Sequence, residues 1–172
     1  MKILALCGSL RRASMNAALL RATARLAPPD MAVEIFDGLG ALPIFNPDLE
    51  ADMPPAVRRL HHAIDAGDAL LIASPEYAHG VTGVLKNALD WLVGFEGFVD
   101  KPVVIFNASP RSIHADAALR EILLTMSARL LTGACLDLPL RGSGLGEEQI
   151  FSTHAPAIRD ALRRLAQGVR KE

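Results

Sequence analysis

The chain has 172 residues, of which 51% are hydrophobic and 22% are charged. This composition is typical of a globular protein and excludes a disordered one. The formal net charge of −1 gives no general attraction to nucleic acids or to anionic membranes. We therefore expect a single domain over residues 1–172 that has neither a nucleic acid nor a membrane as its partner.

Two features of the sequence indicate where the protein resides. Met1 leads directly into the apolar run at 3–7, so we expect no signal peptide, and no apolar stretch approaches the ~20 residues that span a bilayer. Cys7 and Cys135 both fall within strand-like runs, where buried thiols of a reducing compartment are expected. These features predict a cytoplasmic protein.

Five short apolar runs alternate with five helical patterns along the chain. The apolar runs predict strands at 3–7, 33–37, 69–73, 103–107 and 134–138. The helical patterns predict helices after Ser14 and at 56–66, 83–93, 115–131 and 155–167. Residues 38–55 and the glycine-rich stretch 141–146 are interpreted as loops.

This alternation predicts an α/β fold in which right-handed crossovers build a parallel sheet covered on both faces. Five such strands are the content of a flavodoxin-like three-layer sandwich, with a five-stranded parallel sheet of order 2-1-3-4-5. Ligands of such sheets bind at the carboxyl ends of the strands, beside the switch point between the first and third strands. The loops at that edge are 8–16, 74–83 and 108–114, so we expect a functional site there.

The first of these loops has the properties of an anion-binding site. Ser14 stands where a helix N-cap is expected, and a loop between a strand and a helix offers unpaired N–H groups and the positive end of the helix dipole. Phosphate is the most common ligand of such loops. The alternative is an ordinary turn in which Arg11 and Arg12 face the solvent.

Three other anion-binding motifs do not fit this loop. Nothing after Gly8 matches the Gly-x4-Gly-Lys-Ser/Thr motif of nucleotide triphosphatases or the Gly-x-Gly-x-x-Gly motif of dinucleotide-binding folds. The glycines at 142, 144 and 146 follow the fifth strand and are interpreted as loop residues. Low-molecular-weight tyrosine phosphatases share this fold and carry Cys-x5-Arg here, but Cys7 would need an arginine at position 13, where Ala13 stands.

The pattern that remains over residues 8–16 is Gly-Ser-x-Arg-x-x-Ser-x-Asn, and it resembles the NADPH-dependent FMN reductase family. This family includes chromate, quinone and azo reductases of the flavodoxin-like fold. The resemblance implies that this loop holds the FMN phosphate, through four side chains and the backbone amides between them. The implied residues are Ser9, Arg11, Ser14 and Asn16, with Met15 among the residues between them.

A second stretch, residues 74–91, looks like the family signature Pro-Glu-Tyr-Asn…Pro-Gly-x-Leu-Lys-Asn-Ala-x-Asp-Trp. It departs from the signature at Ala78, where asparagine is usual and where we expect the loss of one side-chain hydrogen bond, and at Thr82, where proline is usual. Thr82 is nevertheless a good helix N-cap. The resemblance places four residues of this stretch, and one of the third loop, beside the flavin ring. They are Pro75, Glu76, Tyr77, Ala78 and Ser109.

Individual roles in this second group are open to more than one interpretation. Backbone N–H groups at Glu76 and Tyr77 can stabilise a reduced flavin whatever their side chains. Tyr77 packs on or beside the flavin ring, or it is a surface aromatic that covers the end of the sheet. Glu76 is expected to orient its loop. Arg111 either attracts the phosphates of a nicotinamide dinucleotide or is a solvated arginine, and His61 and His62 are expected at the surface, with no metal site.

These motifs predict an FMN-dependent NAD(P)H oxidoreductase with ping-pong hydride transfer to a quinone, azo, chromate or flavin acceptor. NADPH or NADH is the expected co-substrate, and no catalytic side chain is named, because the cofactor carries the chemistry. The resemblance also implies a homodimer or homotetramer. The helix with Asp90 and Trp91, followed by Phe95 and Phe98, is either the subunit contact or intramolecular core. The alternatives are a non-enzymatic FMN electron carrier and a flavin-free sensor domain.

Overall fold

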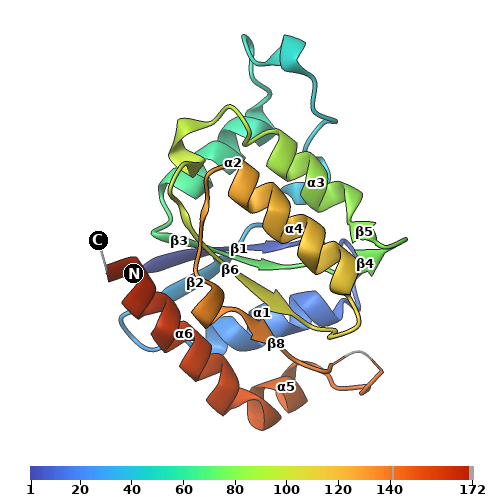
Figure 1. Ribbon diagram of the computed structural model, residues 1–172, viewed down its shortest axis with the longest axis vertical. Helices are drawn as coiled ribbons and strands as arrows, with labels where there is room; N and C mark the ends of the chain where they lie inside the picture. The colour runs from blue at the N-terminus through green and yellow to red at the C-terminus, as the bar shows by residue number, and fades with distance from the viewer. Residues whose placement is uncertain (141, 171–172) are drawn as a thin grey trace.

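The structure is a computed structural model that describes residues 1–140 and 142–170, and it is a three-layer α/β sandwich (Figure 1). The central sheet contains β1 (Lys2–Cys7), β2 (Ala32–Ile35), β3 (Ala69–Ala73), β6 (Pro102–Asn107), β7 (Arg129–Leu130) and β8 (Leu136–Asp137). Its strand pairs are parallel, in the order β2-β1-β3-β6-β7, and β8 also pairs with β6. This order confirms the predicted topology, with β7 and β8 together in the place of the fifth strand.

Helices cover the sheet on both faces. On one face lie α1 (Met15–Leu26), α5 (Glu147–Thr153) and α6 (Ala155–Arg170), and on the other lie α2 (Pro55–Asp65), α3 (Gly83–Asp90) and α4 (Ile113–Thr125) (Figure 1). Successive strand residues point to opposite faces, so Leu71 packs in the core beneath α1, whereas Leu70 and Ile72 pack in the core beneath α2. Among the helices of the described residues, none combines the length and the apolar character needed to cross a bilayer.

The predicted helix at 115–131 is wrong at its C-terminal end. α4 ends at Thr125, and Ser127 two residues later has a φ of +59°, a left-handed conformation that a right-handed helix cannot continue. The chain then forms β7, a 3₁₀ turn η4 (Thr132–Ala134) and β8. The predicted fifth strand at 134–138 is therefore shorter than expected, and the fifth strand position is divided between two short strands.

Two further helix ends differ from the sequence prediction, and one short helix is additional to it. α3 ends at Asp90 and not at residue 93, and α6 extends to Arg170 and not to residue 167. The short helix α5 was not predicted; it follows Gly146 and packs Ile150 into the core under α1. Of the predicted glycine-rich loop at 141–146, residue Arg141 lies outside the described residues.

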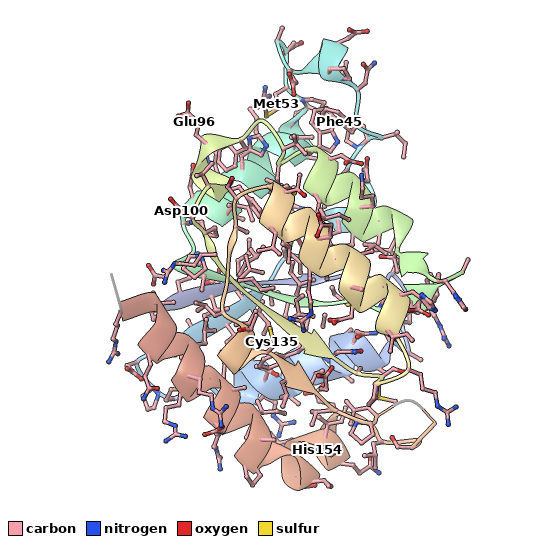
Figure 2. The ribbon with its side chains drawn as sticks, viewed as in Figure 1. Phe45, Met53, Glu96, Asp100, Cys135 and His154 are labelled. Carbon is pink, nitrogen blue, oxygen red and sulfur yellow. The ribbon has the colours of Figure 1, made fainter. Side chains whose placement is uncertain are left out.

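A surface segment between β2 and α2 stands out from the body of the molecule, and Figure 2 shows Phe45 and Met53 at its base. It carries the 3₁₀ turns η1 (Leu39–Ala41) and η2 (Pro47–Leu49), in agreement with the loop expected at 38–55. Asn87 Nδ2 and Trp91 Nε1 donate hydrogen bonds of 2.9 and 2.8 Å to the same acceptor, the carbonyl oxygen of Pro43. The α3 region therefore anchors this segment.

Burial decides whether the residues at the end of α3 and after it form a subunit contact or intramolecular core. Trp91 is only 3% exposed and Phe98, in the 3₁₀ turn η3 (Glu96–Phe98), only 1%. Both rings belong to the core on the α2 face. Of the two alternatives, intramolecular core is confirmed for Trp91 and Phe98, because folding buries their side chains within the same chain.

We expect Trp91→Phe to lower the free energy of unfolding by about 2 kcal/mol, because the smaller phenyl ring leaves a cavity in the core and the bond to Pro43 O is lost, although Pro43 O still accepts the bond from Asn87. Adding Asn87→Ala leaves that carbonyl without a side-chain donor, so the double variant should lose more stability than the two single variants together. Urea denaturation of the four proteins measures these losses. Strictly additive losses would contradict a shared anchor.

Candidate functional site

The carboxyl edge of the sheet is hollowed, and three loops meet around the hollow. This edge hollow has a volume of about 490 Å³, a size typical of pockets that bind small molecules and cofactors. Nine of the ten residues expected at the site line it: Ser9, Arg11, Ser14, Met15, Asn16, Pro75, Glu76, Tyr77 and Ser109. The tenth, Ala78, does not. The structure therefore brings together residues that are up to a hundred positions apart in the sequence.

The wall at the first loop is the N-terminus of α1. Ser14 has an extended backbone and its Oγ accepts a hydrogen bond of 3.3 Å from the Ala17 N–H, so Ser14 is the N-cap, as predicted. Asn16 is only 6% exposed, and its Oδ1 has no hydrogen-bond partner in the protein. A buried polar atom without a partner costs about 1–3 kcal/mol, so the wall is built to receive a polar ligand.

Cys7 lies at the end of β1, directly beneath this loop. Its Sγ is 3.5 Å from the carbonyl oxygen of Ser9, and burial raises the pKa of the thiol. The thiol is therefore uncharged at neutral pH and is not the thiolate nucleophile that a tyrosine phosphatase needs. The structure agrees with the sequence in excluding that chemistry.

The second loop is a small hairpin formed by β4 (Glu76–Tyr77) and β5 (Gly80–Val81). Its two turn residues, Ala78 and His79, have φ values of +48° and +59°. Asparagine and glycine adopt this left-handed conformation more readily than alanine does. The asparagine that the family signature carries here fits the turn, so the departure at Ala78 affects the backbone of the hairpin and not the lining of the hollow.

Glu76 ties this hairpin to α4. Its Oε2 accepts a hydrogen bond of 2.8 Å from the Ala115 N–H in the first turn of that helix. This bond is the main cause that lowers the pKa of Glu76. The carboxylate therefore holds the hairpin at neutral pH, and the bond is lost as the pH falls through the lowered pKa. The geometry agrees with the expectation that Glu76 orients its loop.

Thr82 occupies the N-cap position of α3, but its side chain makes no capping hydrogen bond, so that expectation is wrong in its detail. The Thr82 hydroxyl instead lies 3.4 Å from the hydroxyl of Ser74.

His61 is also less exposed than expected, because its ring stacks on Phe95 with centroids 4.0 Å apart. Within residues 1–140 and 142–170, no group of three or more His, Cys, Asp or Glu side chains is arranged to hold a metal ion.

Seven further residues line the edge hollow that the sequence analysis did not select as site residues. They are Ala13 and Ser74 in the first two loops, Asn107, Ala108 and Ser112 at the third, and Gly142 and Gly144 in the loop before α5. Asn107 Oδ1 accepts a hydrogen bond of 2.9 Å from the Ser109 N–H, which fixes the start of the third loop. Gly142 and Gly144 have φ values of +81° and +70°, which only glycine adopts at little cost. Closely spaced glycines in a sequence indicate a loop with unusual backbone angles, although only the fold shows that this loop reaches the hollow.

A second hollow, of about 530 Å³, adjoins the edge hollow. The two share Ser109 and Gly142, and the remaining residues of the second hollow are Pro110, Arg111 and Pro139. Arg111 is the one charged residue among the described residues that line it. An extended ligand that begins in the edge hollow could therefore continue past Ser109 toward a guanidinium.

Residues 1–137 match the protein family described as NADPH-dependent FMN reductase. The chain belongs to this family. It is 44% identical over 111 residues to an NAD(P)H-dependent FMN reductase of Pseudomonas aeruginosa, an alignment of 63% of this chain and 60% of that protein. It is 36% identical over 139 residues to a quinone reductase of Pseudomonas putida, over 77% of this chain and 72% of that protein.

The structure is also similar to that of FerB, a flavoenzyme NAD(P)H:(acceptor) oxidoreductase from Paracoccus denitrificans. The TM-score is 0.87 at 26% sequence identity, and the alignment covers 99% of this chain and 97% of that chain. A 2-hydroxy-1,4-benzoquinone reductase of a Burkholderia species is 45% identical, but over 53% of this chain and 49% of that protein. The chain thus aligns with about half to three-fifths of the length of the first relatives.

Because Ala78 has a positive φ, Ala78→Gly should stabilise the fold by about 1 kcal/mol, the cost of holding an L-residue in the left-handed region. Ala118→Gly is the matched control in the interior of α4, where the same exchange should destabilise by about 1 kcal/mol. Thermal unfolding of both variants measures the difference. A loss of stability in Ala78→Gly would show that this turn does not require a positive φ.

Proposed function

We propose that the chain is an FMN-dependent NAD(P)H oxidoreductase that reduces small-molecule acceptors, quinones foremost. The observation that carries this proposal is the wall at the N-terminus of α1. There the Ser14 cap, the exposed guanidinium of Arg11 and Asn16, whose buried Oδ1 has no partner, line one hollow. The names of the relatives, two of them quinone reductases, support the same activity.

The residues present fit FMN. Its phosphate dianion suits a helix N-terminus flanked by an arginine, which holds such a group without a metal. The unpartnered Oδ1 of Asn16 is an acceptor, so it suits a hydroxyl or N–H group of the cofactor. In this proposal Ser9, Arg11 and Ser14 hold the phosphate, and Pro75, Glu76, Tyr77 and Ser109 flank the ring.

FMN, when bound, supplies the hydride transfer between NAD(P)H and the acceptor. The protein supplies position and polarity. The hairpin β4–β5 presents its backbone N–H groups and the ring of Tyr77, which is 52% exposed at the rim. Glu76 holds this hairpin through Ala115, and the co-substrate enters from the open side, where Arg111 offers a charge for its phosphates.

We further propose that the protein works in the cytoplasm, without nucleic acid or membrane partners, as a homodimer or homotetramer. The net charge of −1 supports the absence of nucleic acid and membrane partners, the two free cysteines support a reducing compartment, and the oligomeric state of the family supports the second part. Light scattering during size-exclusion chromatography measures the mass. A monomer over the whole working concentration range would contradict the second part.

The proposed function is tested by the visible spectrum of the protein, recorded with FMN and then with NADPH under nitrogen. We expect flavin absorption that bleaches on addition of NADPH or NADH and returns on addition of a quinone. Flavin bands that persist with both nicotinamides would favour the electron carrier over the reductase. A protein that retains no FMN would contradict the proposal that this is a flavoprotein and would favour a flavin-free domain.

Arg11→Gln should weaken FMN binding by about 10-fold or more, because it removes a charge-assisted contact worth about 1.5–3 kcal/mol. Arg12→Gln is the matched control, since Arg12 is the neighbouring exposed arginine and does not line the edge hollow. Quenching of FMN fluorescence measures both affinities. Equal losses in the two variants would show a general electrostatic effect and would contradict a specific role for Arg11.

A further inference from the structure

A small hollow lies behind the edge hollow, between the carboxyl ends of β3 and β6 and the first turns of α4. Its polar lining consists of Ser74, Asn107, Ser112 and Asp116, and aliphatic side chains close the rest. Its free space of about 10 Å³ is close to the ~10–15 Å³ that one water molecule requires. Three of the polar residues, all but Asp116, also line the edge hollow. This inner hollow is therefore a small, mainly apolar pocket with four polar residues in its lining, and it adjoins the proposed cofactor site.

Asp116 connects this inner hollow with the outside. One carboxylate oxygen, Oδ2, accepts a hydrogen bond of 2.7 Å from Arg120 Nε on the surface of α4. The other, Oδ1, is buried and has no partner in the protein. The side chain as a whole is 24% exposed, so Asp116 reaches the solvent and also lines the inner hollow. A buried carboxylate oxygen needs a hydrogen-bond donor, and a water molecule in the inner hollow would supply one.

The other ionisable groups near Asp116 are bonded or stacked elsewhere, or are uncharged. Glu76 is bonded to the Ala115 N–H on the neighbouring residue, and His114 stacks on His79 with ring centroids 4.3 Å apart. From the segment that leads into β8, Cys135 (Figure 2) lies near Arg120, and burial raises the pKa of its thiol, which keeps it uncharged. Of these groups, Asp116 is the one that lines the inner hollow.

We propose that Asp116, acting through one water in the inner hollow, relays the proton that quinone reduction takes from solvent. This inference rests on the proposed function. Reduction of a quinone to a hydroquinone needs two electrons and two protons. NAD(P)H provides both electrons and one proton as a hydride and becomes NAD(P)⁺, and the second proton comes from solvent and ends on the second oxygen of the hydroquinone.

The chain's own groups form the path for that second proton. Asp116 takes it from solvent at its exposed side and passes it to the water. A serine hydroxyl both accepts and donates a hydrogen bond, so Ser112 or Ser74 can carry it from the water to the wall of the edge hollow. The Asn107 side chain, held by the Ser109 N–H, orients the water. Asp116 is thus a positioning residue that acts through this water.

The test compares two electron acceptors on the FMN-loaded protein. A benzoquinone takes up protons with its electrons, whereas ferricyanide takes up electrons alone. For Asp116→Asn we expect the rate with the quinone to fall by about 10-fold and the rate with ferricyanide to stay unchanged. The fall is smaller than the ~100-fold of a directly positioned acid, because solvent also reaches the open edge hollow.

Two control variants separate the relay from a structural effect. Asp90→Asn breaks the matching ion pair with Lys86 on α3, and Arg120→Gln breaks the ion pair of Asp116 but keeps its carboxylate. Neither should change the ratio of the two rates. The solvent deuterium isotope effect on the quinone rate should be larger in Asp116→Asn than in the wild-type protein, and the FMN dissociation constant should be unchanged.

The outcomes distinguish the relay from the proposed function. If the wild-type protein oxidises NADPH with neither acceptor, the proposed function fails. If it uses both acceptors and Asp116→Asn slows both equally or neither, the relay is wrong and the proposed function stands. A high-resolution crystal structure of the protein without FMN gives a readout apart from activity: the relay requires an ordered water on Asp116 Oδ1, and an inner hollow filled by side chains would overturn it.

Discussion

The N-terminus of α1, with its unpaired backbone N–H groups, is the constraint on which the rest of the structure depends. The first N–H groups of any helix have no partner within the helix, and here they face the edge hollow from the centre of the sheet. β1 lies between β2 and β3, so the turn that leads from β1 into α1 is held on both sides. Gly8 is required at this turn, because a Cβ there would lie 2.1 Å from the Ser74 hydroxyl of the neighbouring loop. The two loops can approach each other only without that side chain.

α4 has a comparable role for the other two loops. Its first turn receives the Glu76 carboxylate at Ala115, which fixes the hairpin β4–β5, and the next residue, Asp116, borders the inner hollow. The same turn follows the third loop, in which the Asn107 side chain holds the Ser109 N–H. The site is thus assembled from loops whose positions are set by two helix N-termini and by side chains that bond to backbone groups.

Much of this could be predicted from the sequence, and the failures have identifiable causes. The buried strands are read correctly because strands covered on both faces are continuous apolar runs. The end of α4 is missed because Ser127 carries no sequence signal for a positive φ, and the apolar pattern continues past it. Gly142 was left out of the site because its place at the hollow depends on how the loop before α5 folds across the sheet edge. Asp116 was overlooked for a different reason: it lies within a helical pattern, and only packing shows that one of its oxygens is buried.

The central claim is that the α1 wall recognises the phosphate of FMN, and the most direct test is to compare FMN with riboflavin, which has the same ring and lacks the phosphate. Isothermal titration calorimetry of the protein without flavin gives both dissociation constants. We expect FMN to bind at least about 100-fold more tightly, because the helix N-terminus and the guanidinium act on the phosphate alone. Equal affinities for the two flavins would contradict the account.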